Sequence, residues 1–334
     1  MPELKLIAGD GRIVPYTLCG TRSWNPPAAR PEFSRIAFSA AHVVADPLAD
    51  RDPWLTAAID WGETLEYRRY LFSLGLGVAE AMDTAQRGRG LDWPTSIELS
   101  QRSAALAKDF PGARISCGVG TDQLDASPSV TLAQVTAAYE SQVAAVEAAG
   151  GRIILMARRA LAAAARSAED YAQVYGHILQ QVSEPVILHW LGDIFDPALA
   201  GYWGHCDIEQ AMDVCLQIIA GNAPKVDGIK ISLLDKDKEI GMRRRLPPGV
   251  RIYTGDDFNY AELIAGNGRD NSEALLGNLR RDRSCGVGRA RGADSRRQGG
   301  ILPHPRAYRG VVAPHLPRAH PLLQIGYRLH GLAE

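Results

Sequence analysis

The sequence lacks the features that would place the protein in a membrane, in an oxidising compartment or on a nucleic acid. No apolar run approaches the roughly 18 residues of a membrane-spanning helix. The five cysteines form no CxxC pair and no zinc-like spacing, which favours a reducing cytoplasm and unpaired thiols. The formal net charge is -1, with no coherent basic face before the last part of the chain, and residues 1–12 carry charges rather than an apolar targeting core. We therefore expect a cytoplasmic protein with no membrane or nucleic-acid partner.

A dinucleotide-binding glycine motif is also missing. Open α/β sheets that bind dinucleotides carry GxGxxG directly after an early strand, with an acidic residue about 20 positions later. The segments at 118–121 and 75–77 both lack the third glycine. The pattern disfavours a Rossmann enzyme, and we expect neither a cofactor nor a resident metal.

Short apolar runs alternate with helical patterns along most of the chain. A hairpin is expected at residues 4–18, turning at 9–11. The predicted strands that follow are 35–39, 74–79, 114–119, 152–156, 185–190, 226–234 and 250–254, with a weak eighth at 274–276. Repeated strand-then-helix units favour a parallel sheet, and this number of strands in about 250 residues fits a (β/α)8 TIM barrel. We expect a hairpin and lead-in at 1–34 and one barrel at 35–277.

Capping signals support three of the intervening helices. Apolar residues recur at helical spacing from Leu132 to Val146, and a glycine pair then stops the pattern. Ser167 with Asp170 resembles a capping box, and Asp207 is placed to cap a further helix.

Lys230 is the most informative residue, because it lies inside the apolar run 226–234. Such a run is typical of a strand buried on both faces, where a charged amine is hard to justify as structure. Alternation places Lys230 on one face with Gly228 and Ser232, and the branched residues between them on the other. A dehydrated lysine has a lowered pKa, and its neutral amine can form a Schiff base with a carbonyl. A lysine neutralised by a buried carboxylate is the alternative.

Other polar residues follow the predicted strands. In a barrel of this kind the chemistry belongs to the loops at the carboxyl ends of the strands, so we expect these side chains to converge on one pocket. They are His42, Asp46, Glu80, Asp83, Thr84, Gln86, Arg87, Asp122, Arg158, Arg159, His189, Trp190, Lys230, Gly255, Asp256 and Asp257.

Five segments carry a resemblance to a known family, namely residues 79–88, 117–121, 188–192, 228–230 and 254–257. They resemble the dihydrodipicolinate synthase and N-acetylneuraminate lyase superfamily of class I aldolases, and more closely an uncharacterised branch with the same family label. The resemblance covers about residues 35–277. It implies a barrel that forms an imine between Lys230 and a 2-keto acid, assembles as a homo-oligomer, and carries Asp256 and Asp257 on a GDD-like segment after strand seven.

Two departures from that family bear on the reaction. Its synthases and lyases usually present a Thr-Thr or Ser-Thr pair after strand two, where this chain has residues 80–88. They also place a tyrosine proton relay at the end of strand five, which is the position of His189. Dihydrodipicolinate synthesis itself is therefore not expected. Histidine shuttles protons near neutral pH, so we assign His189 the acid/base role, with a hydrogen-bonded core histidine as the alternative.

The remaining candidates are assigned to substrate binding. The segment after strand two contributes Glu80, Asp83, Thr84, Gln86 and Arg87, for which a salt-bridged loop network is the alternative. The others are His42, Trp190, Gly255, Asp256 and Asp257, with packing as the alternative for Trp190 and loop ordering for the two aspartates. We assign the tract 158–166 to a solvated helix edge, with an anion contact by Arg158 as the alternative.

The composition changes abruptly at Asn278. Residues 279–334 hold eleven Arg, no Lys and three acidic residues, for a net charge of +8, whereas residues 1–278 carry -9. A basic tail for nucleic acid is one interpretation. However, codons can be chosen so that a one-base shift yields an amphipathic, helix-like sequence that resembles the C-terminal helices of the same family. We therefore predict a frameshifted, non-native tail at 278–334 and an exposed apolar surface that lowers stability and activity.

Together these observations predict a lyase of the class I aldolase type that acts on a 2-keto acid or keto-sugar acid through Lys230. Two alternatives stay open. One is a metal-dependent sugar isomerase or aldolase, with ligands drawn from His42, Asp46, Glu80, Asp83 and His189. The other is a non-catalytic barrel that binds a sugar acid, since barrels serve many functions.

Overall fold

The computed structural model describes residues 3–7, 12–17, 33–46, 48–50, 52, 56–85, 87–88, 90–127 and 129–277. The predicted hairpin turn at 9–11, Gln86 and the predicted frameshifted tail at 278–334 lie outside these residues. The first two strands, β1 (Glu3–Ile7) and β2 (Ile13–Thr17), pair antiparallel as a two-stranded sheet of their own, which confirms the N-terminal hairpin.

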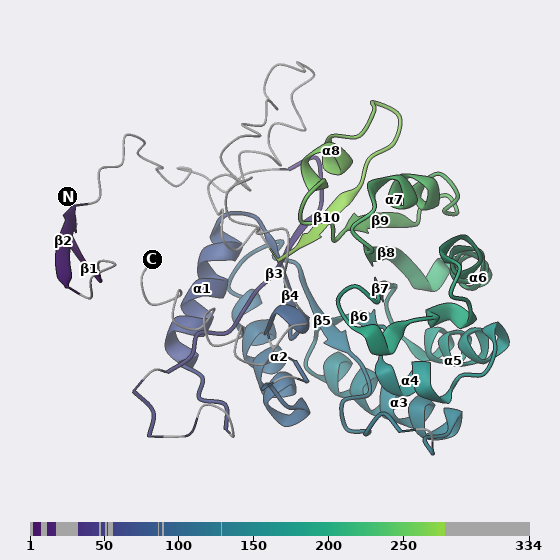
Figure 1. Ribbon diagram of the computed structural model, residues 1–334, viewed down its shortest axis with the longest axis horizontal. Helices are drawn as coiled ribbons and strands as arrows, with labels where there is room; N and C mark the ends of the chain where they lie inside the picture. Colours follow the sequence, from purple (N-terminus) through teal and green to yellow (C-terminus); the bar gives the residue numbers. More distant parts are fainter. Residues whose placement is uncertain are drawn as a thin grey trace.

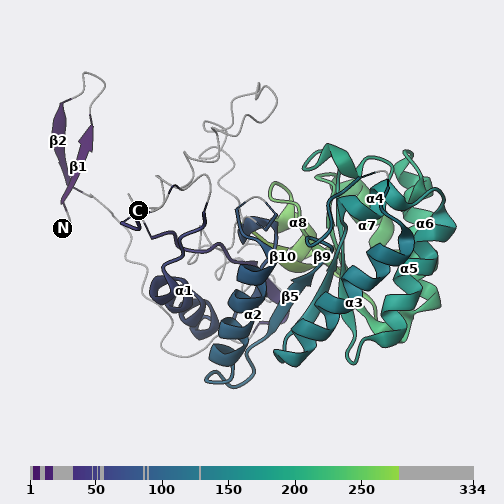
Figure 2. The same cartoon turned by 90° about the horizontal axis from the view of Figure 1, so that it is seen from below.

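Eight parallel strands then close into a barrel (Figures 1 and 2), with β10 pairing to both β9 and β3. The strands are β3 (Ala37–Ala40), β4 (Gly77–Glu80), β5 (Ile115–Val119), β6 (Arg152–Met156), β7 (Val186–Leu191), β8 (Val226–Ser232), β9 (Arg251–Thr254) and β10 (Glu273–Leu276). Each overlaps a run predicted from the sequence, including the weak eighth. The (β/α)8 fold is therefore confirmed.

Helices follow the strands and surround the barrel (Figure 1). They are α1 (Trp61–Ser73), α2 (Trp93–Ala107), α3 (Leu132–Ala148), α4 (Arg159–Ala164), α5 (Ala168–Gln181), α6 (Ile208–Gly221), α7 (Lys236–Arg243) and α8 (Tyr260–Ala265), with four short 3-10 turns: η1 (Asp83–Ala85), η2 (Pro197–Leu199), η3 (Tyr202–Gly204) and η4 (Ala223–Lys225). The capping box of Ser167 and Asp170 begins α5, and the Asp207 carboxylate accepts from Gln210 N at 2.9 Å to begin α6.

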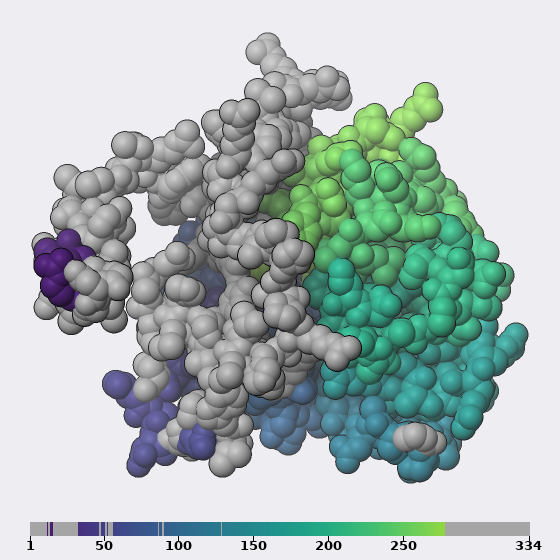
Figure 3. Space-filling model, viewed as in Figure 1, coloured from purple at the N-terminus to yellow at the C-terminus, as the bar shows by residue number. Residues whose placement is uncertain are grey.

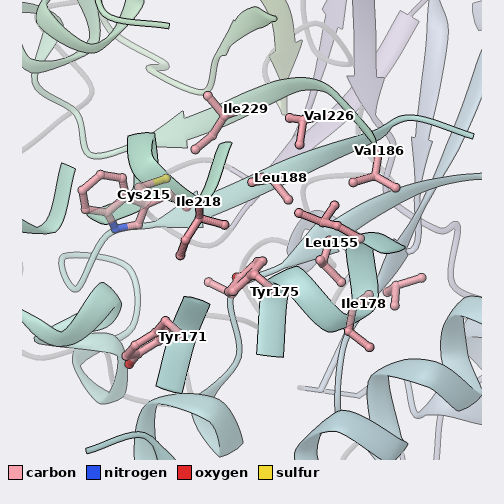
Figure 4. Close-up of a cluster of buried hydrophobic side chains, with 14 of the residues drawn as sticks. Leu155, Tyr171, Tyr175, Ile178, Val186, Leu188, Cys215, Ile218, Val226 and Ile229 are labelled. Carbon is pink, nitrogen blue, oxygen red and sulfur yellow. The ribbon is translucent and has the colours of Figure 1, made fainter. Parts of the chain in front are cut away.

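The core has an outer layer between strands and helices and an inner layer inside the barrel. Alternation along each strand divides its side chains between the two. Figure 4 shows the outer layer between β6, β7, β8 and helices α5 and α6, with side chains of Leu155, Val186, Leu188, Val226 and Ile229 facing Tyr171, Tyr175, Ile178, Cys215 and Ile218. The inner layer includes Phe38, Ile154, Met156, Ile187, Tyr253 and Leu275.

The described barrel residues form a continuous surface on the side coloured teal and green in the space-filling view (Figure 3). Within the described ranges, none of the helices combines the length and apolar character that crossing a bilayer demands.

Candidate active site

Lys230 points into the barrel from β8. Its neighbours Ile229 and Ile231 belong to the helix-side core, so alternation turns the lysine inward, and only 9% of its surface is exposed. Burial lowers the pKa of Lys230, while the charges of Asp83 and Asp257 act in the opposite direction. Both carboxylates act on the amine through their charges.

His189 lies beside Lys230 on the neighbouring strand. The two residues are register partners between β7 and β8, and therefore face the same interior. The imidazole is 1% exposed, and neither ring nitrogen has a hydrogen-bond partner among the residues that the structure describes. Burial, reinforced by the positive charges of Lys230 and Arg158, holds the pKa of His189 well below its usual value. The ring is therefore neutral near pH 7, with one nitrogen free to accept a proton and the other carrying one to donate.

The strand-end segment after β9 shapes the space around the amine. A Cβ placed on Gly255 would lie 2.9 Å from Lys230 Cε and would collide with the hydroxyl of Ser232, so the absence of a side chain at 255 leaves room for the lysine. The buried Asp256 carboxylate accepts from the backbone N–H groups of Phe258 and Asn259 at 2.8 and 2.9 Å. Asp256 thus orders the loop, which is the alternative that the sequence left open. Asp257 is exposed and acts on Lys230 through its charge.

Arg158 reaches over the same end of the barrel from the end of β6. Its side chain is only 14% exposed, which corrects for Arg158 the expectation of a solvated helix edge at residues 158–166. Arg159, which begins that helix, is half exposed and pairs with Asp196. The Arg158 guanidinium lies 3.7 Å from Asp83 and 3.5 Å from Asp122, and one of its N–H groups contacts the Met156 sulfur at 3.1 Å. Position 158 follows a predicted strand end, and this signal was available from the sequence.

The segment after β4 divides between the site and the surrounding structure. Asp83 faces Arg158, whereas the Thr84 hydroxyl donates to the carbonyl of Ala40 at 3.0 Å. Arg87 is 2% exposed and donates to Asp122 at 2.6 and 2.9 Å. Burial, helped by the charge of Arg158, lowers the pKa of Arg87 to about 10. Burial alone would raise the pKa of Asp122, but Arg158 and Arg87 bring it down to about 2.

Glu80 does not face the barrel interior. Its carboxylate is fully buried against α1 and α2, where it accepts from Arg68 at 2.8 and 2.9 Å and from Ser103 at 2.6 Å. Alternation on β4 puts Glu80 on the helix side, the side that also holds Val78. The structure therefore corrects the expectation of a substrate contact by Glu80 and favours a structural ion pair.

Trp190 and His42 both pack against aromatic side chains. Trp190 is 2% exposed and packs edge-on against Trp203 in the helix-side core, because adjacent strand residues face opposite ways and His189 takes the interior. This position corrects the assignment of Trp190 to substrate binding. The His42 ring packs on Tyr67 of α1, with ring centroids 5.1 Å apart.

The structure does not bring together the residues that were considered as ligands of a metal-dependent isomerase or aldolase. Glu80 faces the helices, His42 packs on Tyr67, and His189 faces the interior. Within the ranges that the structure describes, no three histidine, cysteine, aspartate or glutamate side chains come together in a metal-binding group.

The barrel fold is similar to that of solved dihydrodipicolinate synthase structures. The enzyme from Bacillus clausii matches with a TM-score of 0.57 and 13% identity, covering 79% of this chain and 76% of that one. The Acinetobacter baumannii enzyme, solved with pyruvate, gives 0.56 and 16%, covering 78% and 76%. A putative dihydrodipicolinate synthase family protein from Coccidioides immitis gives 0.50 and 15%, covering 91% and 97%.

Residues 4–281 match a family model described as a protein of unknown function, DUF993. The chain belongs to this family. No curated protein matches it.

Proposed function

We propose that this protein is a Schiff-base-forming lyase or aldolase that acts on a 2-keto acid or keto-sugar acid through Lys230. The observation that carries the proposal is the inward-facing, buried amine of Lys230 beside the neutral ring of His189. A lowered pKa increases the fraction of neutral amine near pH 7, and the neutral amine is the nucleophile. The fold of pyruvate-bound dihydrodipicolinate synthase is compatible with this chemistry.

The first stage would form the imine. The lone pair of Lys230 Nζ attacks the carbonyl carbon, and the carbonyl oxygen gains the π electrons and leaves as water after receiving two protons. His189, whose nitrogens make no hydrogen bond within the described ranges, would carry a proton from the attacking nitrogen to the departing oxygen. The net change is one C=N bond formed, one C=O bond broken and one water released.

The imine nitrogen would then take up one proton from the solvent, and the protonated imine would act as the electron sink. Cleavage of the bond between the third and fourth carbons of the 2-keto acid, one bond removed from the imine carbon, sends its electron pair towards the nitrogen and leaves an enamine. The hydroxyl on the fourth carbon loses its proton and becomes the carbonyl of the departing fragment, and condensation is the reverse. His189 would protonate the enamine carbon or remove its proton, according to direction. Hydrolysis of the imine returns the free lysine.

Borohydride reduction tests the proposal without requiring turnover. The chain is incubated with a panel of 2-keto acids and keto-sugar acids and then reduced, and the modified peptide is mapped by mass spectrometry. We expect an adduct on Lys230 that disappears in Lys230→Arg and persists in the control Lys238→Arg, whose side chain pairs with Glu209 on the surface. Binding of a keto acid with no adduct on Lys230 would contradict the proposal and favour a non-catalytic binding barrel.

A further inference from the structure

Arg158 is a cation whose charge is only loosely matched by its neighbours. Charge-assisted bonds from arginine to carboxylate have N–O distances of about 2.7–2.9 Å. Arg158 lies 3.7 Å from Asp83 and 3.5 Å from Asp122. Asp122 is already held by Arg87 at 2.6 Å. Arg158 therefore retains donor capacity for an incoming anion.

The position of Arg158 relative to the amine follows from the strand register. Met156, His189 and Lys230 are successive register partners across β6, β7 and β8. Arg158 comes two residues after Met156, which returns it to the same face, and its guanidinium contacts the Met156 sulfur at 3.1 Å. The Arg158 guanidinium thus lies over the row of inward-facing residues formed by Met156, His189 and Lys230.

Gly120 provides the space that holds the arginine there. A Cβ on Gly120 would collide with Arg158 Nε, and that Nε is buried and makes no hydrogen bond to any part of the chain that the structure describes. The guanidinium is therefore packed on its Nε side, and its two terminal nitrogens remain the donors for a ligand. Two parallel N–H donors match the two oxygens of a carboxylate.

We propose that Arg158 binds the carboxylate of the 2-keto acid whose carbonyl reacts with Lys230, a role that rests on the proposed Schiff-base function. In such an acid the carboxylate is bonded directly to the carbonyl carbon, so an anion site must lie beside the amine. The Thr84 hydroxyl, which the sequence also assigned to substrate binding, donates to the Ala40 carbonyl and is not available to donate to this carboxylate. In the free protein, the 40% exposed Asp83 side chain lies 3.7 Å from the Arg158 guanidinium and partly neutralises its charge. The substrate carboxylate takes the place of Asp83 beside Arg158 when it binds.

The test compares a charged and an uncharged carbonyl compound on the full chain. Pyruvate and 2-oxoglutarate supply the carboxylate, and hydroxyacetone is a small ketone without one. The concentration for half-maximal borohydride trapping on Lys230 is measured for wild type, Arg158→Met, Arg158→Lys and the adjacent control Arg159→Met. Losing a charge-assisted pair should raise this concentration about 10- to 100-fold for the keto acids in Arg158→Met. Hydroxyacetone should be trapped equally by all variants, and Arg158→Lys should give an intermediate value for the keto acids.

The outcomes separate this inference from the function on which it rests. Equal losses for keto acids and hydroxyacetone would show that Arg158 only supports the barrel, and unchanged trapping of the keto acids would show that it does not bind them. If no adduct forms with any compound, the Schiff-base function fails, and keto-acid binding is then followed by calorimetry. Binding to wild type that is lost in Arg158→Met would sustain the anion site, whereas equal binding, or none to wild type, would overturn it.

Discussion

Gly255 packs against the side chain of Lys230, and a Cβ at that position would lie 2.9 Å from Lys230 Cε. Because the backbone at 255 also donates to the Ile231 carbonyl at 2.8 Å, the segment cannot move away freely. The smallest side chain added here should therefore displace the amine.

We expect Gly255→Ala to slow borohydride trapping on Lys230 about 5- to 150-fold, since overpacking of this size costs about 1–3 kcal/mol. The rate of adduct formation measures the effect. Gly176→Ala in α5 is the matched control, because a Cβ there meets no neighbouring atom of the described residues within 4 Å. Equal trapping by Gly255→Ala and wild type would show that the lysine does not need this space.

The carboxylates near Lys230 should set the pH dependence of imine formation. The reactive form is the neutral amine, so trapping increases as the pH rises through the pKa of Lys230. Burial lowers this pKa, and the charges of Asp83 and Asp257 raise it. Asp83→Asn and Asp257→Asn should therefore lower the pKa further and move the acid limb of the trapping rate to lower pH.

The pH profile of the trapping rate tests this prediction. Asp109→Asn is the control, because Asp109 is exposed and follows the C-terminal end of α2, at the opposite end of the barrel. A shift to higher pH, or one of the same size in all three variants, would contradict it.

Replacement of Lys230 should separate stability from activity. Burial lowers the pKa of Lys230 in the folded protein below that in the unfolded chain. The protonated amine therefore lowers the free energy of unfolding. Lys230→Met should abolish the adduct and stabilise the protein by about 1 kcal/mol near pH 7, in the range usual for removal of a strained functional group.

The stability difference should itself depend on pH. The stability gained by Lys230→Met is fully present below the pKa that Lys230 has in the folded protein. This gain disappears as the pH rises towards the ordinary lysine pKa of about 10.4. Urea unfolding at several pH values measures it. Destabilisation by Lys230→Met at pH 7 would mean that the amine has a structural role.

Glu80 should matter for folding rather than for chemistry. Removal of one partner from a buried ion pair leaves an uncompensated charge, so Glu80→Ala should destabilise by about 3–5 kcal/mol through the loss of its contact with Arg68. Glu66→Ala removes an exposed pair with Arg69 and should change stability by no more than about 1 kcal/mol. Urea unfolding measures both. Unchanged stability together with a lost adduct would restore Glu80 as a substrate contact.

The predicted frameshift at Asn278 has a direct check in the coding DNA. The family match ends at residue 281, close to the position where the composition changes. We expect a one-base shift near codon 278 to restore an amphipathic, helix-like reading, and the frame-restored protein to unfold at a higher temperature. A shifted reading with early stop codons would dismiss the idea.

Much of the fold could be predicted because its signals are local. Apolar runs, period-two alternation and caps such as Ser167 and Asp207 depend on residues a few positions apart. They located all eight barrel strands and turned Lys230 inward, as the structure confirms. The same rule, applied strictly, would have separated His189 from Trp190, since adjacent strand residues face opposite sides.

Only the tertiary structure decided the faces of Glu80 and Arg158. The run at β4 has small or apolar residues on both faces, so the sequence alone does not show which face is the inner one. In the structure, Arg68 on α1 and Ser103 on α2 donate hydrogen bonds to the Glu80 carboxylate and so place it on the helix side. Arg158 turns over the barrel because Gly120, far away in the chain, leaves space for its guanidinium. Local sequence pattern determines which helices and strands form. Whether the side chain of a strand-end residue turns inward, and which charges surround it, depends on the volume and charge of neighbours that only closure of the barrel brings together.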